Sequence, residues 1–254
     1  MAKNKVAIVT GGGSGIGKGI TRIFTKHGID VVIAGRDFAK LEKAAKDLRV
    51  AGAEIYPVKC DVAVQSEVES MFDKALEKFG KVDILINNAG IAEPMAAITD
   101  IDMKLVHDIV NINWMGYFYC ARRAAKEMKK QGSGNIINIG SVEGLISLPG
   151  IVYGPMKAAV HQFTKVLSRE LAALQIRVNC ITPGLVLTEM MDGLTDRDVD
   201  VFLKYIPMHK ALVPDDVGNL AYFLVSEEAR YITGSIITAD SGITADGGWY
   251  AFGL

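Results

Sequence analysis

The chain has 254 residues, half of them hydrophobic, with 28 basic and 29 acidic side chains and a net charge near −1. This length predicts one large domain or two small ones, and such a chain buries roughly 70–75% of its unfolded surface without disulfides or metals. The balanced charge argues against nucleic acid and anionic membranes as partners.

The three cysteines, Cys60, Cys120 and Cys180, are odd in number and far apart, and no Cys/His cluster suggests a metal site. We expect three reduced, buried thiols. The N-terminus runs directly into a strand-like segment that is too short for a signal peptide or a spanning helix. We therefore expect a soluble, cytoplasmic protein.

Short apolar strands alternate with helices along the chain. The expected strands cover residues 6–10, 31–34, 54–60, 82–86, 135–139, 176–181 and 235–239. The expected helices cover residues 16–27, 38–50, 64–79, 114–130 and 153–174. This alternation predicts a single doubly wound, Rossmann-type α/β domain over residues 1–254, with about seven parallel strands and helices on both faces.

A glycine-rich segment, Thr10 to Gly17, joins the first strand to the first helix and reads T-G-x-x-x-G-x-G. Glycines at this point permit a tight turn and the close approach of backbone to a pyrophosphate at the helix N-terminus. The segment therefore predicts a dinucleotide cofactor.

The end of the second strand, Ala34-Gly35-Arg36-Asp37, bears on which dinucleotide is bound. An acidic residue at this point favours NAD, whereas an arginine accommodates the 2′-phosphate of NADP. Gly35 takes the acidic position and Arg36 follows, which favours NADP. Asp37 keeps NAD open, because a register error of one residue would reverse the preference.

Tyr153 and Lys157 are four residues apart, so on a helix they share one face. A nearby ammonium favours the phenolate, which predicts that the pKa of Tyr153 falls below its usual value of about 10. Ser141, from a separate strand end, could hold a substrate oxygen against the phenol. Pro155 is tolerated only in the first turn, so Tyr153 should begin the helix.

With these motifs in order, the chain resembles the short-chain dehydrogenase/reductase family, in its Y-x-x-x-K branch, over essentially its whole length. The matching motifs are Thr10–Gly17, Asp61-Val62, Asn87-Asn88-Ala89-Gly90, Asn113 with Gly116, Ser141, Tyr153–Lys157, Pro183–Thr188 and Asp240-Ser241-Gly242.

The resemblance implies functional residues of two kinds. The catalytic set is Asn113, Ser141, Tyr153 and Lys157. The cofactor contacts are Thr10, Gly11, Ser14, Gly15, Ile16, Gly17, Arg36, Asp61, Val62, Asn88, Ala89, Gly90, Tyr153, Lys157, Pro183, Gly184 and Thr188.

The resemblance also implies reversible hydride transfer between a nicotinamide and a ketone or secondary alcohol. Tyr153 would protonate the developing alkoxide and Ser141 would hold the same oxygen. Lys157 would lower the pKa of Tyr153 and bind the nicotinamide ribose, and Asn113 would anchor a water that links Lys157 to solvent. No metal is needed. Asn111 is a register rival of Asn113.

Several other residues invite a role. Gly140 stands where many members have a second serine, a departure that we expect to be harmless. Glu143 could face the pocket mouth, although a solvated loop carboxylate is the favoured interpretation. We expect His27 to make a favourable contact with a helix dipole, and His107 and His161 to be packed or solvated. His209 lies between residues 188 and 214, and we do not favour contact between it and the substrate.

Residues 188–214 are expected to form a lid over the substrate, and residues 243–254 a C-terminal tail. The mostly apolar side chains of the lid are Met190, Met191, Phe202, Tyr205 and Met208. Some of them should pack the lid against the rest of the protein, and the others indicate a moderately apolar substrate that is cyclic, steroid-like or medium-sized. The tail's Trp249, Tyr250 and Phe252 should cover a neighbouring subunit or its active-site mouth. We expect a homo-oligomer, a tetramer or a dimer, joined through helices 114–130 and 153–174.

Three other functions are alternatives to this one. An enoyl-thioester reductase would need its lysine at position 160, which is Val160, so we reject it. A 3-ketoacyl-carrier-protein reductase stays open, with a candidate basic face at Arg122, Arg123, Lys126, Lys129 and Lys130 that a solvated helix also explains. A non-catalytic cofactor-binding regulator is disfavoured because the catalytic set is complete.

Overall fold

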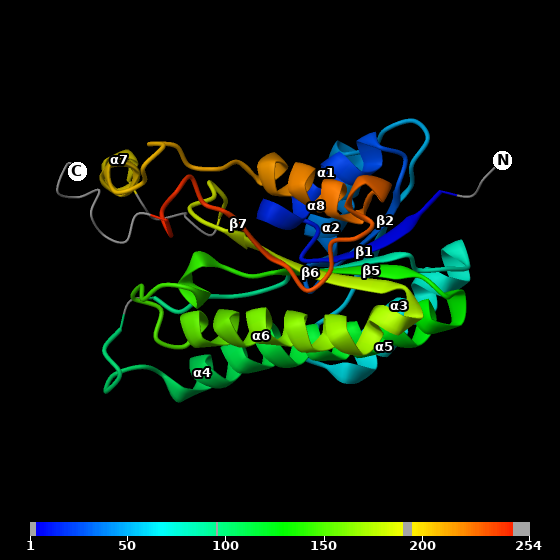
Figure 1. Cartoon of the computed structure of the whole chain (residues 1–254), viewed down its shortest axis with the longest axis horizontal. Helices are drawn as coiled ribbons and strands as arrows, with labels where there is room; N and C mark the ends of the chain where they lie inside the picture. Colours follow the sequence, from blue (N-terminus) through cyan, green and yellow to red (C-terminus); the bar gives the residue numbers. More distant parts are fainter. Residues whose placement is uncertain (1–3, 95, 190–194, 246–254) are drawn as a thin grey trace.

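The computed structural model describes residues 4–94, 96–189 and 195–245, which form a parallel sheet between two layers of helices (Figure 1). The strands are β1 (Val6–Thr10), β2 (Asp30–Gly35), β3 (Ile55–Lys59), β4 (Ile84–Asn87), β5 (Gly134–Ile139), β6 (Ile176–Pro183) and β7 (Ile236–Ala239). Their order is β3-β2-β1-β4-β5-β6-β7, and each neighbouring pair is parallel. The predicted doubly wound α/β fold is confirmed.

Helices cover both faces of the sheet (Figure 1). On one face lie α3 (Gln65–Phe79), α4 (Met103–Val110), α5 (Gly116–Gln131) and α6 (Tyr153–Leu171). On the other lie α1 (Gly15–Lys26), α2 (Phe38–Asp47) and α8 (Pro214–Val225), while α7 (Asp196–Lys204) stands apart from both layers.

The central strands are apolar along their whole length because both faces are covered. In β2, Val31 and Ile33 pack with the core beneath α1, α2 and α8. Val32 and Ala34 of the same strand pack with the core beneath α3 and α5. This alternation fixes the strand's register, since a slip of one residue would exchange the two sets.

Two helical segments differ from the sequence prediction. The helix expected from Trp114 is preceded by α4 and by a π-helical turn, Asn111–Met115, in which Gly116 N donates to Asn111 O. The sequence prediction did not include α8, although Pro214 at its first turn is a helix-start signal. Tyr153 begins α6, as Pro155 predicted.

The N-terminus of α6 is capped by Glu93, a residue from the loop after β4. The Glu93 carboxylate accepts hydrogen bonds from Val152 N at 2.6 Å and from Tyr153 N at 3.1 and 3.2 Å. The first backbone N–H groups of a helix have no partner within it, and a carboxylate satisfies them with favourable charge. Glu93 therefore fixes the start of the helix that carries Tyr153.

Gly140, just after β5, leaves room for the buried ring of His161. A Cβ at Gly140 would stand 2.5 Å from His161 Nε2 and 2.8 Å from Cys180 Sγ. The His161 ring also lies against Gly144, where a Cβ would stand 2.6 Å from its Cε1. The glycine at position 140 is thus tied to the histidine at position 161.

Removing the cap should destabilise the fold. We predict that Glu93→Ala lowers the free energy of unfolding by about 1–2 kcal/mol, because two backbone donors lose a charged acceptor. Glu93→Gln, which keeps an acceptor oxygen, should lose less. Urea unfolding measures both, with Glu77→Ala on the exposed face of α3 as the control. Equal stability of Glu93→Ala and the control would contradict the cap.

A side chain at position 140 should also be costly. We predict that Gly140→Ala lowers the free energy of unfolding by about 1–3 kcal/mol through overpacking, and that His161→Ala in the same chain recovers part of the loss. Gly35→Ala is the matched control, because its Cβ would meet its nearest atom at an ordinary 3.6 Å. Additive effects of the two substitutions, measured by thermal unfolding, would show that positions 140 and 161 are not coupled.

Candidate active site

The glycine turn between β1 and α1 has the backbone geometry that its sequence predicts. Gly11 has φ +68° and Gly15 has φ +47°, values that side-chain-bearing residues rarely adopt. A Cβ at Gly17 would stand 2.3 Å from Gly11 O. Glycine is therefore needed at these positions for the turn to close.

Thr10, at the end of β1, ties the turn to the loop after β4. Its Oγ1 accepts hydrogen bonds from Asn88 N at 2.9 Å and Ala89 N at 3.1 Å, and donates to Ile86 O at 3.2 Å. Asn88 Nδ2 donates back to Thr10 O at 2.8 Å. The two loops thus form one wall, and Thr10, Asn88 and Ala89 brace it.

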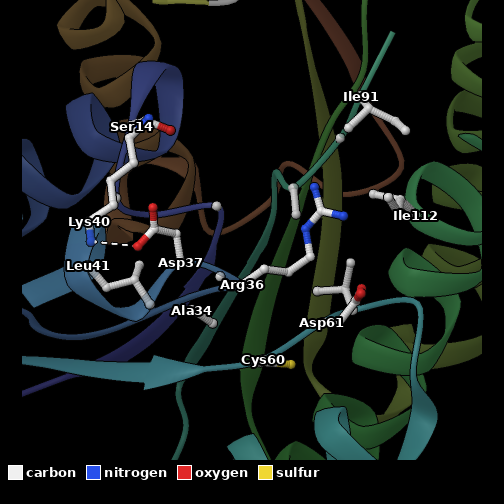
Figure 2. Close-up of a pocket in the computed structure, with 16 residues that line it drawn as sticks. Ser14, Ala34, Arg36, Asp37, Lys40, Leu41, Cys60, Asp61, Ile91 and Ile112 are labelled. Carbon is white, nitrogen blue, oxygen red and sulfur yellow. Dashed lines mark hydrogen bonds between the residues drawn. The ribbon is translucent and has the colours of Figure 1, made fainter. Parts of the chain in front are cut away.

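A groove runs across the carboxyl ends of β1, β2, β3 and β4 (Figure 2). Seven of the predicted cofactor residues line it: Gly11, Ser14, Arg36, Asp61, Val62, Ala89 and Gly90. The prediction missed other lining residues, among them Gly13, Lys40, Leu41, Cys60, Ile91 and Ile112. The sequence feature that could have indicated Lys40 and Leu41 as groove residues is the start of a helix directly after Asp37.

Arg36 and Asp37 have different environments at the end of β2. Figure 2 shows Asp37 turned toward Lys40, whose backbone N–H donates to Asp37 Oδ1 at 3.0 Å, whereas Arg36 extends toward the side with Asp61. Asp37 is therefore the N-cap of α2. Gly35 is the last residue of β2, so Arg36 is the first side chain beyond the strand.

The N-terminus of α1 is hydrogen-bonded to a side-chain carboxylate in this structure. Glu189 Oε2 accepts a hydrogen bond from Gly15 N at 3.0 Å. Thr188 lies beside the same point, with its Cβ 3.4 Å from the position of a Gly15 Cβ. Helix N-termini bind carboxylates and phosphates through the same backbone donors. The turn therefore fits the pyrophosphate of a dinucleotide, with Ile16 and Gly17 in the first turn of the helix.

Pro183 and Gly184 end β6 on the same edge of the sheet. Gly184 N donates to Ala239 O at 2.9 Å, which ties this point to β7. A Cβ at Gly184 would stand 2.8 Å from Asp240 Cα, so the chain is closely packed here. From Gly184 the chain continues toward Thr188 and the α1 N-terminus.

Ser141, Tyr153 and Lys157 meet at the carboxyl end of β5. Ser141 follows the strand and is buried, and it lies close enough to Tyr153 to lower the pKa of the phenol. Lys157 lies one helical turn after Tyr153, 2% exposed, with Nζ 5.3 Å from the centroid of the Tyr153 ring. The predicted serine, tyrosine and lysine therefore lie together.

The electrostatics of Tyr153 differ from the prediction. Burial raises the pKa of the Tyr153 phenol, the Glu143 charge raises it further, and the Ser141 hydrogen bond opposes them. The predicted lowering of this pKa is wrong for this structure, because burial and the nearby carboxylates outweigh any effect of Lys157. Lys157 Nζ donates instead to Ile139 O at 2.8 Å and to Tyr117 OH at 3.3 Å. Burial in turn lowers the pKa of Lys157 to about 8.

Glu143 is half-buried, so the favoured interpretation of a solvated loop carboxylate is wrong. It lies in a 3₁₀ turn, Val142–Gly144, directly after Ser141. Burial and the nearby Glu93 charge raise the pKa of the Glu143 carboxyl, and a hydrogen bond from the backbone of Gly150 opposes them. Glu93 carried no sequence signal, since it caps α6 from 59 residues upstream of Val152.

Asn113 is fully buried and its amide is paired with one backbone unit. Its Oδ1 accepts from Ile91 N at 2.9 Å and its Nδ2 donates to Ile91 O at 2.8 Å. Asn111, the alternative to Asn113 for the active-site asparagine, is exposed, so Asn113 is the buried asparagine of the two. The π-helical turn at this point is a feature that is frequent at functional sites.

The histidines and cysteines lie mostly away from this chemistry. His27 stacks on Tyr222 with ring centroids 3.7 Å apart, and His107 is exposed. His209 is exposed in the lid segment, and its Nδ1 lies 3.0 Å from Leu203 O. All three cysteines are buried free thiols.

The described residues hold neither a cluster of metal ligands nor a membrane-spanning helix. No group of three His, Cys, Asp or Glu side chains in residues 4–94, 96–189 and 195–245 is placed to hold a metal ion. None of the helices in the part of the chain that the structure describes is long and apolar enough to cross a membrane.

Comparisons with known proteins agree with this geometry. A family model described as enoyl-(acyl carrier protein) reductase matches residues 11–244. The 3-oxoacyl-[acyl-carrier-protein] reductase FabG of Chlamydia pneumoniae is 36% identical over 245 residues, which cover 94% of this chain and 97% of the relative. The 3alpha-hydroxysteroid dehydrogenase of Mediterraneibacter gnavus is 36% identical over 248 residues, again covering 94% and 97%.

Solved structures give the same result. The 3-ketoacyl-(acyl-carrier-protein) reductase of Brucella melitensis complexed with NADH has a TM-score of 0.89 and 33% identity, covering 96% of this chain and 100% of that one. An actinorhodin polyketide ketoreductase with NADPH has a TM-score of 0.90 and 31% identity, covering 95% and 97%. Since the family model and these relatives span nearly the whole chain, it belongs to the short-chain dehydrogenase/reductase family of NAD(P)-dependent oxidoreductases that act on C=O and CH–OH groups.

Proposed function

We propose that this protein transfers a hydride reversibly between NADP(H) and a ketone or secondary alcohol, with Asn113, Ser141, Tyr153 and Lys157 as its catalytic set. One observation carries the proposal: the buried Ser141 and Lys157 and the half-buried Tyr153 lie together at the same edge of the sheet as the glycine turn. Ligands of open α/β sheets bind at this carboxyl edge. The bound nicotinamide would supply the hydride.

The protein's own groups would handle the proton and the oxygen. The raised pKa keeps the Tyr153 phenol protonated at neutral pH, which suits it to give a proton to the alkoxide formed in ketone reduction. Ser141, buried beside that phenol, would hold the same oxygen. Lys157 would bind the nicotinamide ribose, and Asn113 would hold the loop at Ile91 beside them.

NADP is the proposed cofactor because of the two residues that follow β2. Asp37 already accepts from a helix N–H, and Arg36 is an exposed cation that lines the groove. A guanidinium binds a 2′-phosphate in a planar fork. The contacts proposed along the cofactor are those of the turn and groove together with Asn88, Pro183, Gly184 and Thr188.

A moderately apolar substrate is proposed. The hydroxysteroid dehydrogenase relative acts on a substrate of this kind by its name, and the lid segment presents exposed apolar side chains at Phe202, Tyr205 and Met208. Their exposure does not support the view that they only pack the lid down. Met190, Met191 and the aromatic tail lie outside the described residues.

A 3-oxoacyl-carrier-protein reductase is the second candidate, favoured by the FabG relatives. The candidate basic face gives it little support. Arg123 is buried in ion pairs with Glu69, Asp73 and Glu127. The last turn of α5 leads into the amino end of β5, on the opposite edge of the sheet from Ser141.

We also propose a cytoplasmic homo-oligomer, a tetramer or a dimer. Phe118 of α5 and Val166 of α6 are 40% and 55% exposed, and the rings of Phe118 and Phe163 lie 5.9 Å apart between the two helices. These apolar side chains support an interface on α5 and α6.

Removing the phenol oxygen should stop the reaction. We predict that Tyr153→Phe lowers kcat for ketone reduction by about 10²–10⁴-fold, since the general acid is lost, while the cofactor Kd changes less than about threefold. Tyr56→Phe, on β3 away from the site, should leave both values unchanged. A panel of ketones, steroids and 3-oxoacyl thioesters assayed with NADPH gives the rates. Substantial turnover by Tyr153→Phe would refute the assigned acid.

Removing Arg36 should weaken NADPH selectively. We predict that Arg36→Ala raises the KM for NADPH by about 10–100-fold, the value of a charge-assisted hydrogen bond, and leaves the KM for NADH within about twofold. Lys43→Ala, an exposed cation on α2, is the control. A preference of the wild-type protein for NADH over NADPH would contradict the NADP assignment.

A further inference from the structure

We propose that Tyr117 is a positioning residue for Lys157, and that its buried hydroxyl fixes the lysine ammonium at the site. The inference rests on the proposed function, which makes Lys157 a catalytic residue. Tyr117 is the second residue of α5, is 1% exposed and is among the largest fully buried side chains of the described chain. Neither the glycine turn nor the tyrosine–lysine pair pointed to it.

The ammonium, a backbone carbonyl and the Tyr117 hydroxyl form a closed triangle of hydrogen bonds. Lys157 Nζ donates to Ile139 O at 2.8 Å and to Tyr117 OH at 3.3 Å. The Tyr117 hydroxyl in turn donates to Ile139 O at 3.0 Å. The proton of the phenol is thereby directed to the carbonyl, so its oxygen lone pair is available to the ammonium.

Two aromatic rings flank the same ammonium. Lys157 Nζ lies 5.2 Å from the centroid of the Tyr117 ring and 5.3 Å from that of Tyr153. A cation at this distance from a phenol ring gains cation–π attraction, and more so when it is desolvated. Tyr117 therefore contacts the ammonium through both its hydroxyl and its ring.

The position of Tyr117 does not depend on Lys157. Asn87 Nδ2 donates to Tyr117 O at 3.3 Å and to Asn138 Oδ1 at 2.9 Å, which ties the tyrosine backbone to β4 and β5. The preceding Gly116 is packed so closely that its Cβ would stand 2.8 Å from Val62 Cγ2. A residue held this firmly on its own can act as a support for a flexible lysine side chain.

Lysine needs such support at this depth. An ammonium has three donors and a flexible four-carbon stem, and burial without partners is costly. Ile139 O and Tyr117 OH accept hydrogen bonds from two of the three N–H donors of the Lys157 ammonium. The third donor is then available for the role proposed for Lys157 in the reaction. Burial raises the pKa of Tyr117 well above its usual value, so its phenol stays neutral and serves as a hydrogen-bonding partner only.

The groups that face Lys157 come from four elements, and each bears on its titration. Tyr153 and His161 lie on α6, Tyr117 on α5, Glu143 on the 3₁₀ turn and Cys180 on β6. Loss of the Tyr117 hydroxyl removes an acceptor from the charged form of Lys157 and leaves the other groups in place. The charged form is then less stable, so the pKa of Lys157 should fall.

The test compares Tyr117→Phe with Tyr119→Phe, a half-buried tyrosine two residues further along α5. Carbon-13 NMR of labelled lysine, with the Lys157 signal assigned from Lys157→Arg, should show the Lys157 pKa falling by about one unit in Tyr117→Phe only. This measurement needs no turnover. If the wild type reduced no carbonyl, the proposed function would fail while the contact could still be read.

The pH profile of ketone reduction is the second readout. In Tyr117→Phe the alkaline limb of kcat should move to lower pH by about one unit, a loss of about fivefold at about pH 8 that disappears at about pH 6. A residue that only packs the core would lower stability without moving the limb. If the Lys157 pKa and the alkaline limb of kcat in Tyr117→Phe both equal those in Tyr119→Phe, Tyr117 does not position the lysine.

A fluorinated tyrosine keeps the test decisive if Tyr117→Phe does not fold. 3-Fluorotyrosine placed at position 117 preserves the shape and the hydroxyl but makes the oxygen a poorer acceptor. The Lys157 pKa and the alkaline limb should shift in the same direction by a smaller amount. An unchanged pKa and limb in this protein would overturn the proposal.

Discussion

A buried ammonium is the constraint on which the rest of the site depends. Lys157 is 2% exposed, and a charge at that depth is tolerated only when hydrogen bonds replace its lost water. Those bonds come from Ile139 O at the end of β5 and from Tyr117 in α5. The strand end and both helices must therefore be in register before the lysine can be placed.

The loop after β4 joins the cofactor half of the site to the proton half. Asn88 binds Thr10 beside the glycine turn, and Ile91 pairs with Asn113. Two residues further on, Glu93 caps the helix that begins with Tyr153. One short segment thus bonds to β1, to the π-helical turn and to α6. Supporting contacts of this kind hold reactive groups within the small tolerance that catalysis needs.

Local patterns in the sequence predicted most of the fold and the reactive groups. Apolar runs located the seven strands, and Pro155 located the start of α6. The same patterns could not show contacts between distant residues. Glu93 meets Val152 across 59 residues and Tyr117 meets Lys157 across 40, so neither pair has a local spacing to detect. The expected pKa of Tyr153 failed for the same reason, because burial and distant carboxylates outweigh the neighbour four residues away.

The packing of His161 against Gly140 couples two positions that lie 21 residues apart in the chain. A Cβ at position 140 would stand 2.5 Å from the imidazole Nε2 and 2.8 Å from Cys180 Sγ. A side chain at position 140 would therefore require the imidazole and the thiol to shift. The effect of a substitution at position 140 thus depends on the residues at positions 161 and 180, although none of these residues is one of the four proposed to carry out the reaction.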